Sequence, residues 1–177
     1  MTSLSEQQLV LLAQQGLPYD TRFFQLLVKP YVSPLVGYCT KLLNDGHDAE
    51  DAVQETLIKA LSHLKQFSWQ TSFRAWLYRI AHNECIDRLR MRQRWSFDSD
   101  VDIEGLISST PSDNDDDFQH FLLQLMPELS WIDKNIMLLR YRTSLDFQEI
   151  ADICEMKLSA VKMRHSRIIE ALQNKFD

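Results

Sequence analysis

Three acidic residues in the first half of the chain have types and a spacing that could do chemistry. Asp48, Asp51 and Glu55, in the segment DAEDAVQETLIKAL, recur every three or four residues, so a helix would present them on one side. Carboxylates placed in this way could bind a metal ion or act as a general acid and base. No two-histidine metal motif accompanies them, and the chain has no Gly-rich phosphate loop. We therefore expect no catalytic residue, no metal and no cofactor, and favour a charged docking surface for another protein.

A basic segment near the C-terminus, AVKMRHSRIIEALQNKF, has the composition of a helix that reads duplex DNA. Lys162, Arg164, His165 and Arg167 crowd its N-terminal half, where lysine and arginine can meet guanine acceptors or phosphates in the major groove. The preceding segment EIADIC and a short turn complete a helix-turn-helix pattern. A solvated basic face on a bundle helix is the alternative interpretation.

A second basic cluster, in residues 74–94, is interleaved with aromatic residues. Its arginines are Arg74, Arg79, Arg88, Arg90, Arg92 and Arg94, and the nearby aromatic residues are Trp69, Phe73, Trp76, Tyr78 and Trp95. Arginine beside exposed aromatic rings suits a single strand whose bases unstack, because every base has a π-face. Alternatively, the rings belong to a core and the arginines are only solvated, which fits Phe73 and Trp76.

The charge of the chain is distributed unevenly along its 177 residues. The net charge is −6, which alone would argue against a DNA-binding protein. Residues 1–92 hold ten basic and nine acidic side chains, and residues 118–177 hold eight of each. Residues 93–117, rich in Asp and Ser, hold one basic and eight acidic side chains. The acidity therefore lies in a middle segment that we interpret as a flexible linker between two small domains.

The scarcity of turn residues, with four Gly and five Pro, predicts an all-α fold. The capping patterns that mark helix starts are Ser5 with Gln8, Ser130 with Asp133, and Asp146 with Glu149. Gly16 could end the first helix. Asp48 is expected to be the N-cap of the acidic helix, and Ser159 the N-cap of the basic C-terminal helix.

Interruptions of the helical pattern are expected at four places. Pro30 and Pro34 should kink or break the second helix, with Ser33 as the N-cap of a new one, because proline lacks the backbone donor. A polar break at residues 68–72 should separate the acidic helix from a long basic one. In the second half, which begins near Phe118, Pro127 should end the first helix.

The chain carries no sign of export or membrane insertion. No apolar run approaches the roughly 18 residues of a membrane span, and the N-terminus lacks the features of a signal peptide. Cys39, Cys85 and Cys154 are odd in number and without zinc spacing, so we expect reduced, buried thiols. A cytoplasmic protein without direct membrane insertion is expected.

Three motifs in order resemble those of the extracytoplasmic-function sigma factors of bacterial RNA polymerase. They are DAEDAVQETLIKAL, FRAWLYRIAHNECIDRLR and EIADICEMKLSAVKMRHSRIIEAL, and the resemblance covers nearly the whole chain outside the linker. It implies a sigma region 2 domain in residues 1–92, the acidic linker in 93–117, and a region 4 helix-turn-helix domain in 118–177. Where the family often has glycine in the region 4 turn this chain has Glu155, and Ser159-Ala160 replaces the usual Gly-Thr pair.

The resemblance also implies three sets of site residues. Docking on the core polymerase would use Asp48, Glu50, Asp51, Gln54 and Glu55. Recognition of the −10 element as a melted strand would use Phe67, Ser68, Trp69, Gln70, Arg74, Trp76, Arg79, Asn83, Asp87, Arg88 and Arg90. Recognition of the −35 element as duplex would use Ser159, Ala160, Lys162, Met163, Arg164, His165 and Arg167.

The function implied is promoter-specific initiation of transcription by a protein that is not an enzyme. Its partners would be the core RNA polymerase (the β′ clamp helices and the β flap), promoter DNA and an anti-sigma factor. A helix-turn-helix regulator that binds duplex DNA without polymerase is the alternative. A metal-dependent hydrolase using Asp48, Asp51 and Glu55 is a rival of another class.

Overall fold

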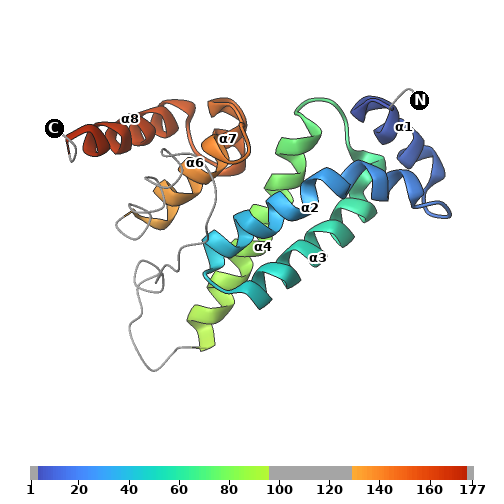
Figure 1. The fold of residues 1–177 in the computed structure, drawn as a ribbon, viewed down its shortest axis with the longest axis horizontal. Helices are drawn as coiled ribbons and strands as arrows, with labels where there is room; N and C mark the ends of the chain where they lie inside the picture. The colour runs from blue at the N-terminus through green and yellow to red at the C-terminus, as the bar shows by residue number, and fades with distance from the viewer. Residues whose placement is uncertain (1–3, 96–128, 175–177) are drawn as a thin grey trace.

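The computed structural model describes residues 4–95 and 129–174, and every regular element within these ranges is helical (Figure 1). The first range contains α1 (Glu6–Gly16), α2 (Arg22–Leu43), α3 (Gly46–His63), the short 3-10 helix η1 (Leu64–Gln66) and α4 (Phe73–Trp95). The second contains α6 (Trp131–Tyr141), α7 (Phe147–Ile153) and α8 (Leu158–Asn174). The predicted all-α fold is confirmed.

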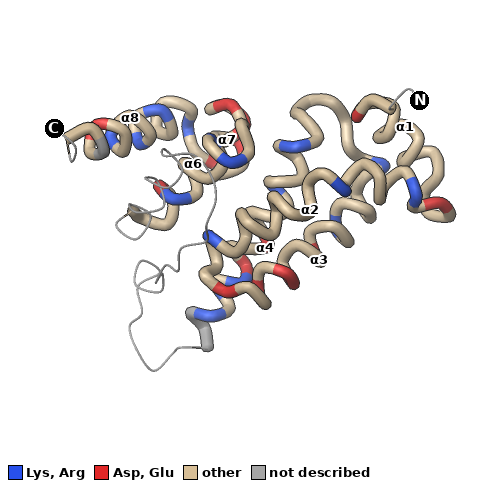
Figure 2. Tube along the Cα trace, in the orientation of Figure 1, with Lys and Arg blue, Asp and Glu red and all other residues tan. Residues whose placement is uncertain are grey.

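Helices α2, α3 and α4 pack side by side as a bundle, with α1 at one end. Ala49, Ala52 and Ala60 of α3 are buried, and their small side chains let α3 approach its neighbours closely. Leu35 of α2 and Leu77 of α4 are fully buried and fill the space between the helices. Where α3 begins and α4 ends, acidic and basic residues lie together (Figure 2).

Helix α2 runs without interruption through two prolines, so the expected break is wrong. Pro30 and Pro34 both lie inside the helix, although neither can donate to the carbonyl four residues earlier. Tyr31 and Leu35, which directly follow the prolines, are buried in the bundle, and this packing compensates for the two missing bonds. Ser33 therefore lies within α2 and caps no new helix.

Three predicted capping patterns are confirmed. The side chains of Ser5, Ser130 and Asp146 each accept a hydrogen bond from the backbone N–H three residues later. At Ser5 and Asp146 the return bond to the cap backbone completes a capping box. The first helix ends at Gly16, as predicted.

Two predicted N-caps are displaced by a few residues. The N-cap of α3 is Asp45, whose side chain accepts from the backbone N–H of Asp48, so Asp48 lies in the first turn. Helix α8 begins at Leu158, and the carbonyl of Lys157 accepts its first backbone bonds, so Ser159 also lies inside the first turn. In both cases a polar residue just upstream of the predicted one starts the helix.

Helices α7 and α8 form the predicted helix-turn-helix. The turn between them contains Glu155 with φ of 54°, in the left-handed region that favours glycine. Ile150 of α7 and Val161 of α8 are both buried in the same hydrophobic cluster. This packing holds the two helices in place relative to each other. Glu155 is thus a non-glycine residue in a backbone conformation that glycine adopts without strain.

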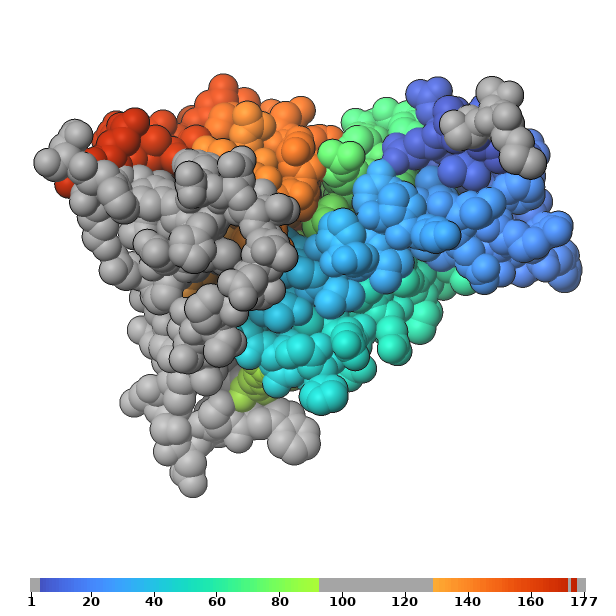
Figure 3. Space-filling model, viewed as in Figure 1, coloured from blue at the N-terminus to red at the C-terminus, as the bar shows by residue number. Residues whose placement is uncertain are grey.

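The two halves pack against each other, with α7 on α4 and α6 on α2. In Figure 3 side chains of the second half meet those near the start of α4. Buried residues of both halves belong to one hydrophobic cluster, a contact that the prediction of two linked domains did not include. A side-chain carbon added at Gly37 of α2 would lie only 3.1 Å from Nη1 of Arg142, at the end of α6.

A buried polar cluster of Tyr38, His82 and Asn135 lies in this interface. The hydroxyl of Tyr38 donates to Asn135 Oδ1 at 2.7 Å, and Asn135 Nδ2 lies 3.1 Å from His82 Nδ1. All three side chains are nearly inaccessible to solvent. Burial lowers the pKa of His82 to about 4, so its imidazole is neutral near pH 7 and can accept from the Asn135 amide.

The predicted domain boundaries fall partly outside the described residues. Helix α4 continues to Trp95, so the boundary after residue 92 falls within it. Most of the predicted linker, 93–117, lies outside the described residues. The expected helix start near Phe118 and the break at Pro127 lie outside them as well.

Replacing Glu155 with glycine should stabilise the protein. Relief of the left-handed strain outweighs the extra chain entropy of glycine in the unfolded state, for a gain of about 0.5–1 kcal/mol in the free energy of unfolding. Urea unfolding monitored by circular dichroism measures it. Glu155→Ala, which removes the same side chain but keeps the strain, is the matched control. An equal gain in both variants would assign the effect to the side chain instead.

Acidification should weaken the packed structure through His82. The pKa of His82 is about 4 in the folded state and 6.5 ordinarily. Between these pH values the unfolded state binds a proton and the folded state does not. Stability is therefore fully present above about pH 6.5 and is lost as the pH falls towards 4, with about 1–2 kcal/mol lost between pH 7 and 5. Urea unfolding of the wild type and of His82→Gln at both pH values isolates this contribution. A pH dependence that is identical in the two proteins would contradict it.

Candidate polymerase and DNA interfaces

At the acidic start of α3, one carboxylate forms an ion pair within the fold and the others face solvent. Asp48 forms an ion pair with Arg92 of α4, and Asp45 lies 3.6 Å from the same guanidinium. Glu50 and Asp51 are exposed, as is Gln54 one turn later, whereas Glu55 is half-buried. Of the five predicted docking residues, Asp48 therefore already has a structural role, and the others lie on the outer surface of α3.

An apolar residue belongs to the same outer surface of α3. The side chain of Ile58 is 57% exposed and follows Asp51 by seven residues and Gln54 by four, so it shares their side of the helix. Sequence reasoning missed it, although Ile58 falls outside the apolar stripe that α3 turns towards the core. A large exposed apolar side chain beside carboxylates is typical of a protein-binding surface.

The loop between η1 and α4 is built on an aromatic cluster. Phe67 is buried, with its ring centroid 5.1 Å from Trp69, 5.7 Å from Phe73 and 5.1 Å from Trp76. Trp69 alone among the four is substantially exposed, at 45%. Phe67 and Trp76 thus support the loop from inside, and Trp69 presents an aromatic face outside.

The side chain of Gln14 in α1 holds this loop in place. Its amide donates to the backbone carbonyls of Leu64 at 2.8 Å and Phe67 at 3.0 Å. Ser68 and Gln70 follow on the exposed part of the loop, so both predicted residues are accessible. Sequence reasoning missed Gln14, because no local pattern links residues 50 or more positions apart.

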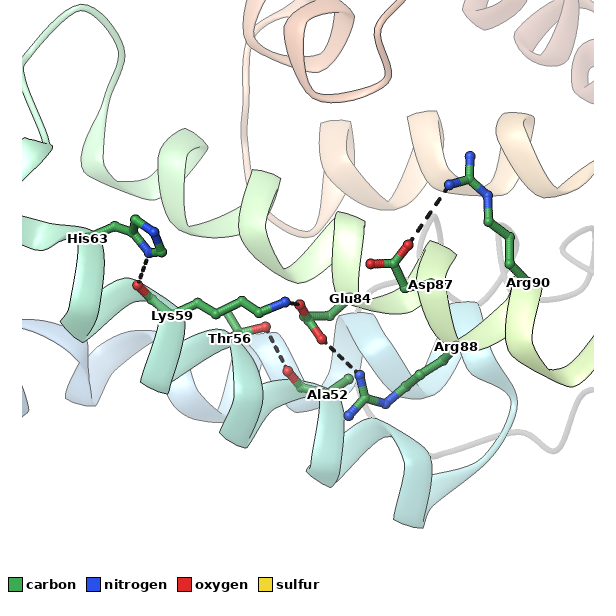
Figure 4. Close-up of polar contacts among 8 residues, drawn as sticks. All are labelled: Ala52, Thr56, Lys59, His63, Glu84, Asp87, Arg88 and Arg90. Atoms are coloured by element: carbon green, nitrogen blue, oxygen red, sulfur yellow. Dashed lines mark hydrogen bonds and ion pairs between the residues drawn. The ribbon is translucent and has the colours of Figure 1, made fainter.

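The outer surface of α4 carries a row of exposed polar residues. Arg79, Asn83, Asp87 and Arg90 recur at intervals of three or four and lie on one side of the helix. Arg90 and Asp87 approach each other to 3.9 Å at the surface (Figure 4). Arg74, at the start of the helix, instead donates to the backbone carbonyl of Thr143 at 3.0 Å.

A buried carboxylate anchors another predicted DNA contact, Arg88. Glu84 is 4% exposed and accepts from Arg88 at 3.0 Å on one oxygen and from Lys59 of α3 on the other (Figure 4). The hydrogen bond to Glu84 raises the pKa of Lys59. The guanidinium of Arg88 is therefore held on α4 by a carboxylate that also binds α3, and it has less freedom than Arg79 or Arg90 to meet a ligand.

The predicted reading residues of α8 divide into exposed and internally bonded groups. Ser159, Lys162, Met163 and Arg167 are exposed, and Ala160 is half-buried. The other two predicted residues, Arg164 and His165, contact α6 and α7, as described next. The exposed members form a surface that carries two cations, Lys162 and Arg167, and begins with the small residue Ser159 in the first turn of α8.

Arg164 and His165 are held by other helices. Arg164 donates to Asp133 of α6 at 2.9 Å. His165 Nε2 lies 2.8 Å from the hydroxyl of Tyr141, and its ring packs on Phe147 of α7 at 5.0 Å. Desolvation, with a smaller contribution from Arg140, lowers the pKa of His165, so it brings no positive charge to DNA near neutral pH.

No group of three or more His, Cys, Asp or Glu side chains that could hold a metal ion occurs in residues 4–95 and 129–174. Asp48, Asp51 and Glu55, the ligands of the hydrolase hypothesis, do not converge there. Within the same ranges no helix is long and apolar enough to cross a membrane. Cys39 and Cys85 are buried and Cys154 is half-buried, all with free thiols.

Comparison with protein families decides between the remaining interpretations. The family described as sigma-70 region 2 matches residues 27–95, and the one described as sigma-70, region 4 matches residues 122–172. The chain is also similar to an ECF RNA polymerase sigma factor over nearly its whole length. It belongs to the extracytoplasmic-function sigma factors. It thus directs promoter-specific transcription, and the duplex-binding regulator without polymerase docking is not favoured.

Relatives of this sigma factor are similar over nearly its whole length. It is 31% identical to the RNA polymerase sigma-H factor of Pseudomonas aeruginosa, over 97% of the chain and 94% of that protein. It is 30% identical to the ECF RNA polymerase sigma-E factor of Haemophilus influenzae, over 97% of the chain and 95% of that protein. The sigma factor RpoE of Bartonella quintana, solved in complex with the anti-sigma factor NepR, matches with a TM-score of 0.69 and 28% identity, over 85% of this chain and 94% of that one.

Removing the charge of Glu84 should destabilise this sigma factor. Glu84→Gln weakens two charge-assisted bonds at once, but Lys59 and Arg88 can still reach water, so we expect a loss of about 1–2 kcal/mol in the free energy of unfolding. Asp87→Asn, which removes only the exposed contact with Arg90, should change it by less than about 0.5 kcal/mol. Urea unfolding measures both. Equal losses in the two variants would show that Glu84 is no better bonded than a surface carboxylate.

Proposed function

We propose that the sigma factor docks on core RNA polymerase through the outer surface of α3. Glu50, Asp51, Gln54 and Ile58 supply the exposed carboxylates, amide and apolar group, and Glu55 lies at the edge. Asp48 acts indirectly, because its pair with Arg92 fixes the start of α3 against α4. Burial of Ile58 on docking adds apolar area to charge complementarity, and the partner surface on the polymerase is basic around an apolar patch.

The −10 element is read as a melted strand by the loop after η1 and by α4. Trp69 offers a stacking surface, and Ser68 and Gln70 flank it on the same exposed loop. Arg79 and Arg90 continue this surface along α4 with positive charges for a phosphate backbone, and Asn83 between them adds a neutral amide. Phe67 and Trp76 support the loop from within, and Arg88 orients the Glu84 carboxylate that binds Lys59 of α3. Asp87 orients Arg90 at the surface.

The −35 element is read in the major groove by α8. Ser159 and Ala160 allow close approach of the helix start, and Lys162, Met163 and Arg167 project outward from it. Arg164 positions α8 on α6 through Asp133 and reaches DNA only if that bond is exchanged. The observation that supports the proposal is that the region 4 helix-turn-helix follows a region 2 bundle in the same chain, and that α3 of this bundle has exposed carboxylates of its own.

The sigma factor itself catalyses no reaction. The polymerase makes the bonds, and the chain lowers the free energy of the melted promoter by binding the unstacked strand. It acts in the cytoplasm. Because the similar RpoE of Bartonella quintana was solved with an anti-sigma factor, we include such a protein among the partners of this chain.

Run-off transcription tests the function directly. Purified core polymerase is combined with this protein and with promoter fragments from the genome that encodes it. We expect transcripts that appear only when the protein is added and that share a pair of upstream elements. Absence of both transcripts and co-elution with core polymerase would contradict the proposal.

Two charge variants should separate the two surfaces. Lys162→Ala removes one phosphate or base contact, and it should weaken binding to a −35 duplex by about five- to tenfold while core binding is unchanged. Asp51→Lys should weaken core binding and leave −35 binding intact, because Asp51 lies on the outer surface of α3 and the −35 residues lie on α8. Fluorescence anisotropy with labelled duplex and with core polymerase measures both. Parallel losses in one variant would show that the surfaces are not separate.

A further inference from the structure

A cavity of about 320 Å³ lies between α2, the start of α4 and the turn after α6. Three segments line it: Pro30, Tyr31 and Pro34 of α2, Arg74 and Tyr78 of α4, and residues 142–144 of the turn. A volume of this size lies at the lower end of the range for small-molecule sites in proteins. Of the residues assigned above to polymerase or promoter DNA, only Arg74 belongs to this wall.

Two guanidinium groups line the cavity, and no carboxylate is among the described residues of its wall. Arg142 makes no hydrogen bond or ion pair within residues 4–95 and 129–174. Arg74 donates through Nη1 to the carbonyl of Thr143 at 3.0 Å, which leaves further N–H donors available. Glu6, which lies outside the wall, accepts from the hydroxyl of Tyr31 and balances at most one of the two charges. The wall of the cavity is therefore positive.

A third cation adds to the positive charge beside Arg142. Lys41 lies one turn after Gly37 on α2, and Gly37 leaves room for Nη1 of Arg142 against that helix. The pKa of Lys41 is lowered, chiefly by desolvation and also by the charge of Arg142. Because neighbouring cations repel each other, an anion bound here would stabilise the folded chain.

A buried hydroxyl on the wall also lacks a partner. Tyr78 is 1% exposed, and its hydroxyl makes no hydrogen bond with the described residues. Burial raises the pKa of Tyr78, while Arg74 and Arg142 both act to lower it, so the two guanidinium charges lie within electrostatic reach of the same oxygen. An acceptor atom placed in the cavity could receive this hydroxyl and both arginines.

A phosphoryl group fits this set of donors better than a carboxylate does. Two guanidinium forks, with the hydroxyls of Tyr78 and Ser144, offer more donors than two carboxylate oxygens can accept. A phosphoryl group has three acceptor oxygens and up to two negative charges. The rings of Pro30, Pro34 and Tyr31 offer an apolar surface for the remainder of the ligand. The wall thus suits a phosphoryl group attached to a flat or apolar body, as in a nucleotide.

We propose that this cavity binds a small phosphorylated molecule of nucleotide type. Arg74 and Arg142 hold the phosphoryl group, Tyr78 donates to it, and the body of the ligand packs against Pro30 and Pro34. The inference goes beyond the proposed function and does not rest on it, because binding involves neither polymerase nor promoter. Since Arg74 and Arg142 come from different halves of the chain, the ligand contacts both.

Isothermal titration calorimetry of the full-length chain with adenosine monophosphate tests the proposal. Adenosine and inorganic phosphate are titrated as separate probes. We expect the monophosphate to bind about tenfold more tightly than either, because only the monophosphate uses both the guanidinium groups and the apolar wall. Arg142→Gln should weaken its binding by about tenfold or more, since it removes charge-assisted hydrogen bonds. The fold should be retained in this variant, because Arg142 has no bond to the described residues.

Arg22→Gln is the matched control, since it makes the same change of charge at an exposed residue of α2 outside the cavity. Its affinity for the monophosphate should stay within about twofold of the wild type. Tyr78→Phe removes only the unpartnered hydroxyl and should weaken binding by about threefold or more. This variant decides the question if Arg142→Gln loses helical circular dichroism.

Several outcomes would overturn the proposal. Equal affinity of the wild type and Arg142→Gln, or an equal loss in Arg22→Gln, would show that the monophosphate does not bind in the cavity. Adenosine that binds as tightly as the monophosphate would overturn the role of the phosphoryl group, and inorganic phosphate that does so would overturn the role of the apolar wall. If no probe binds and Arg142→Gln instead weakens binding of promoter DNA, the cavity holds a phosphate of DNA and the small-molecule site is wrong.

Discussion

The position of Tyr38 is the constraint on which much of the packing depends. Its ring is fully buried and meets Tyr78 of α4 edge-on, with centroids 5.2 Å apart. Burial of a hydroxyl without a partner costs about 1–3 kcal/mol, so the placement of this ring in the core requires an acceptor. That acceptor is Asn135, on the other half of the chain. Within the first half, the hydroxyl has only the longer contact with His82 Nδ1, at 3.5 Å, so the second half supplies its shorter hydrogen bond.

Ion pairs decide which cations remain available for DNA. Arg92 and Arg164 are each bonded to a carboxylate of a neighbouring helix, and Arg88 is bonded to Glu84 of its own helix, so all three are engaged within the fold. Lys162 and Arg167 project from α8 without such a partner among the contacts of the described residues. The overall charge of −6 therefore says little about binding, because the sign of each surface is set locally.

Local signals predicted the helices well and failed where distant contacts intervene. The caps at Ser5, Ser130 and Asp146 were predictable because a capping box is a pattern within four residues. Continuity of α2 through Pro30 and Pro34 was not, because burial against the bundle overrides the local penalty.

The site residues were predictable in type more than in orientation. Spacing placed the acids on α3 and the cations on α4 and α8. Only the fold shows that Phe67 supports a loop from inside, that Arg164 is bonded to Asp133, and that Ile58 lies outside. Side-chain partners such as Glu84 for Lys59, 25 positions apart, leave no local trace in the sequence.

The close approach of Gly37 to Arg142 has an evolutionary consequence. Any side chain at position 37 would press on a guanidinium that belongs to the other half, because even a single carbon would lie 3.1 Å from it. The size of one residue is thus coupled to the identity of another more than a hundred positions away. Among homologues that keep the packed arrangement, these two positions should covary, with a larger residue at position 37 accompanied by a shorter one at position 142.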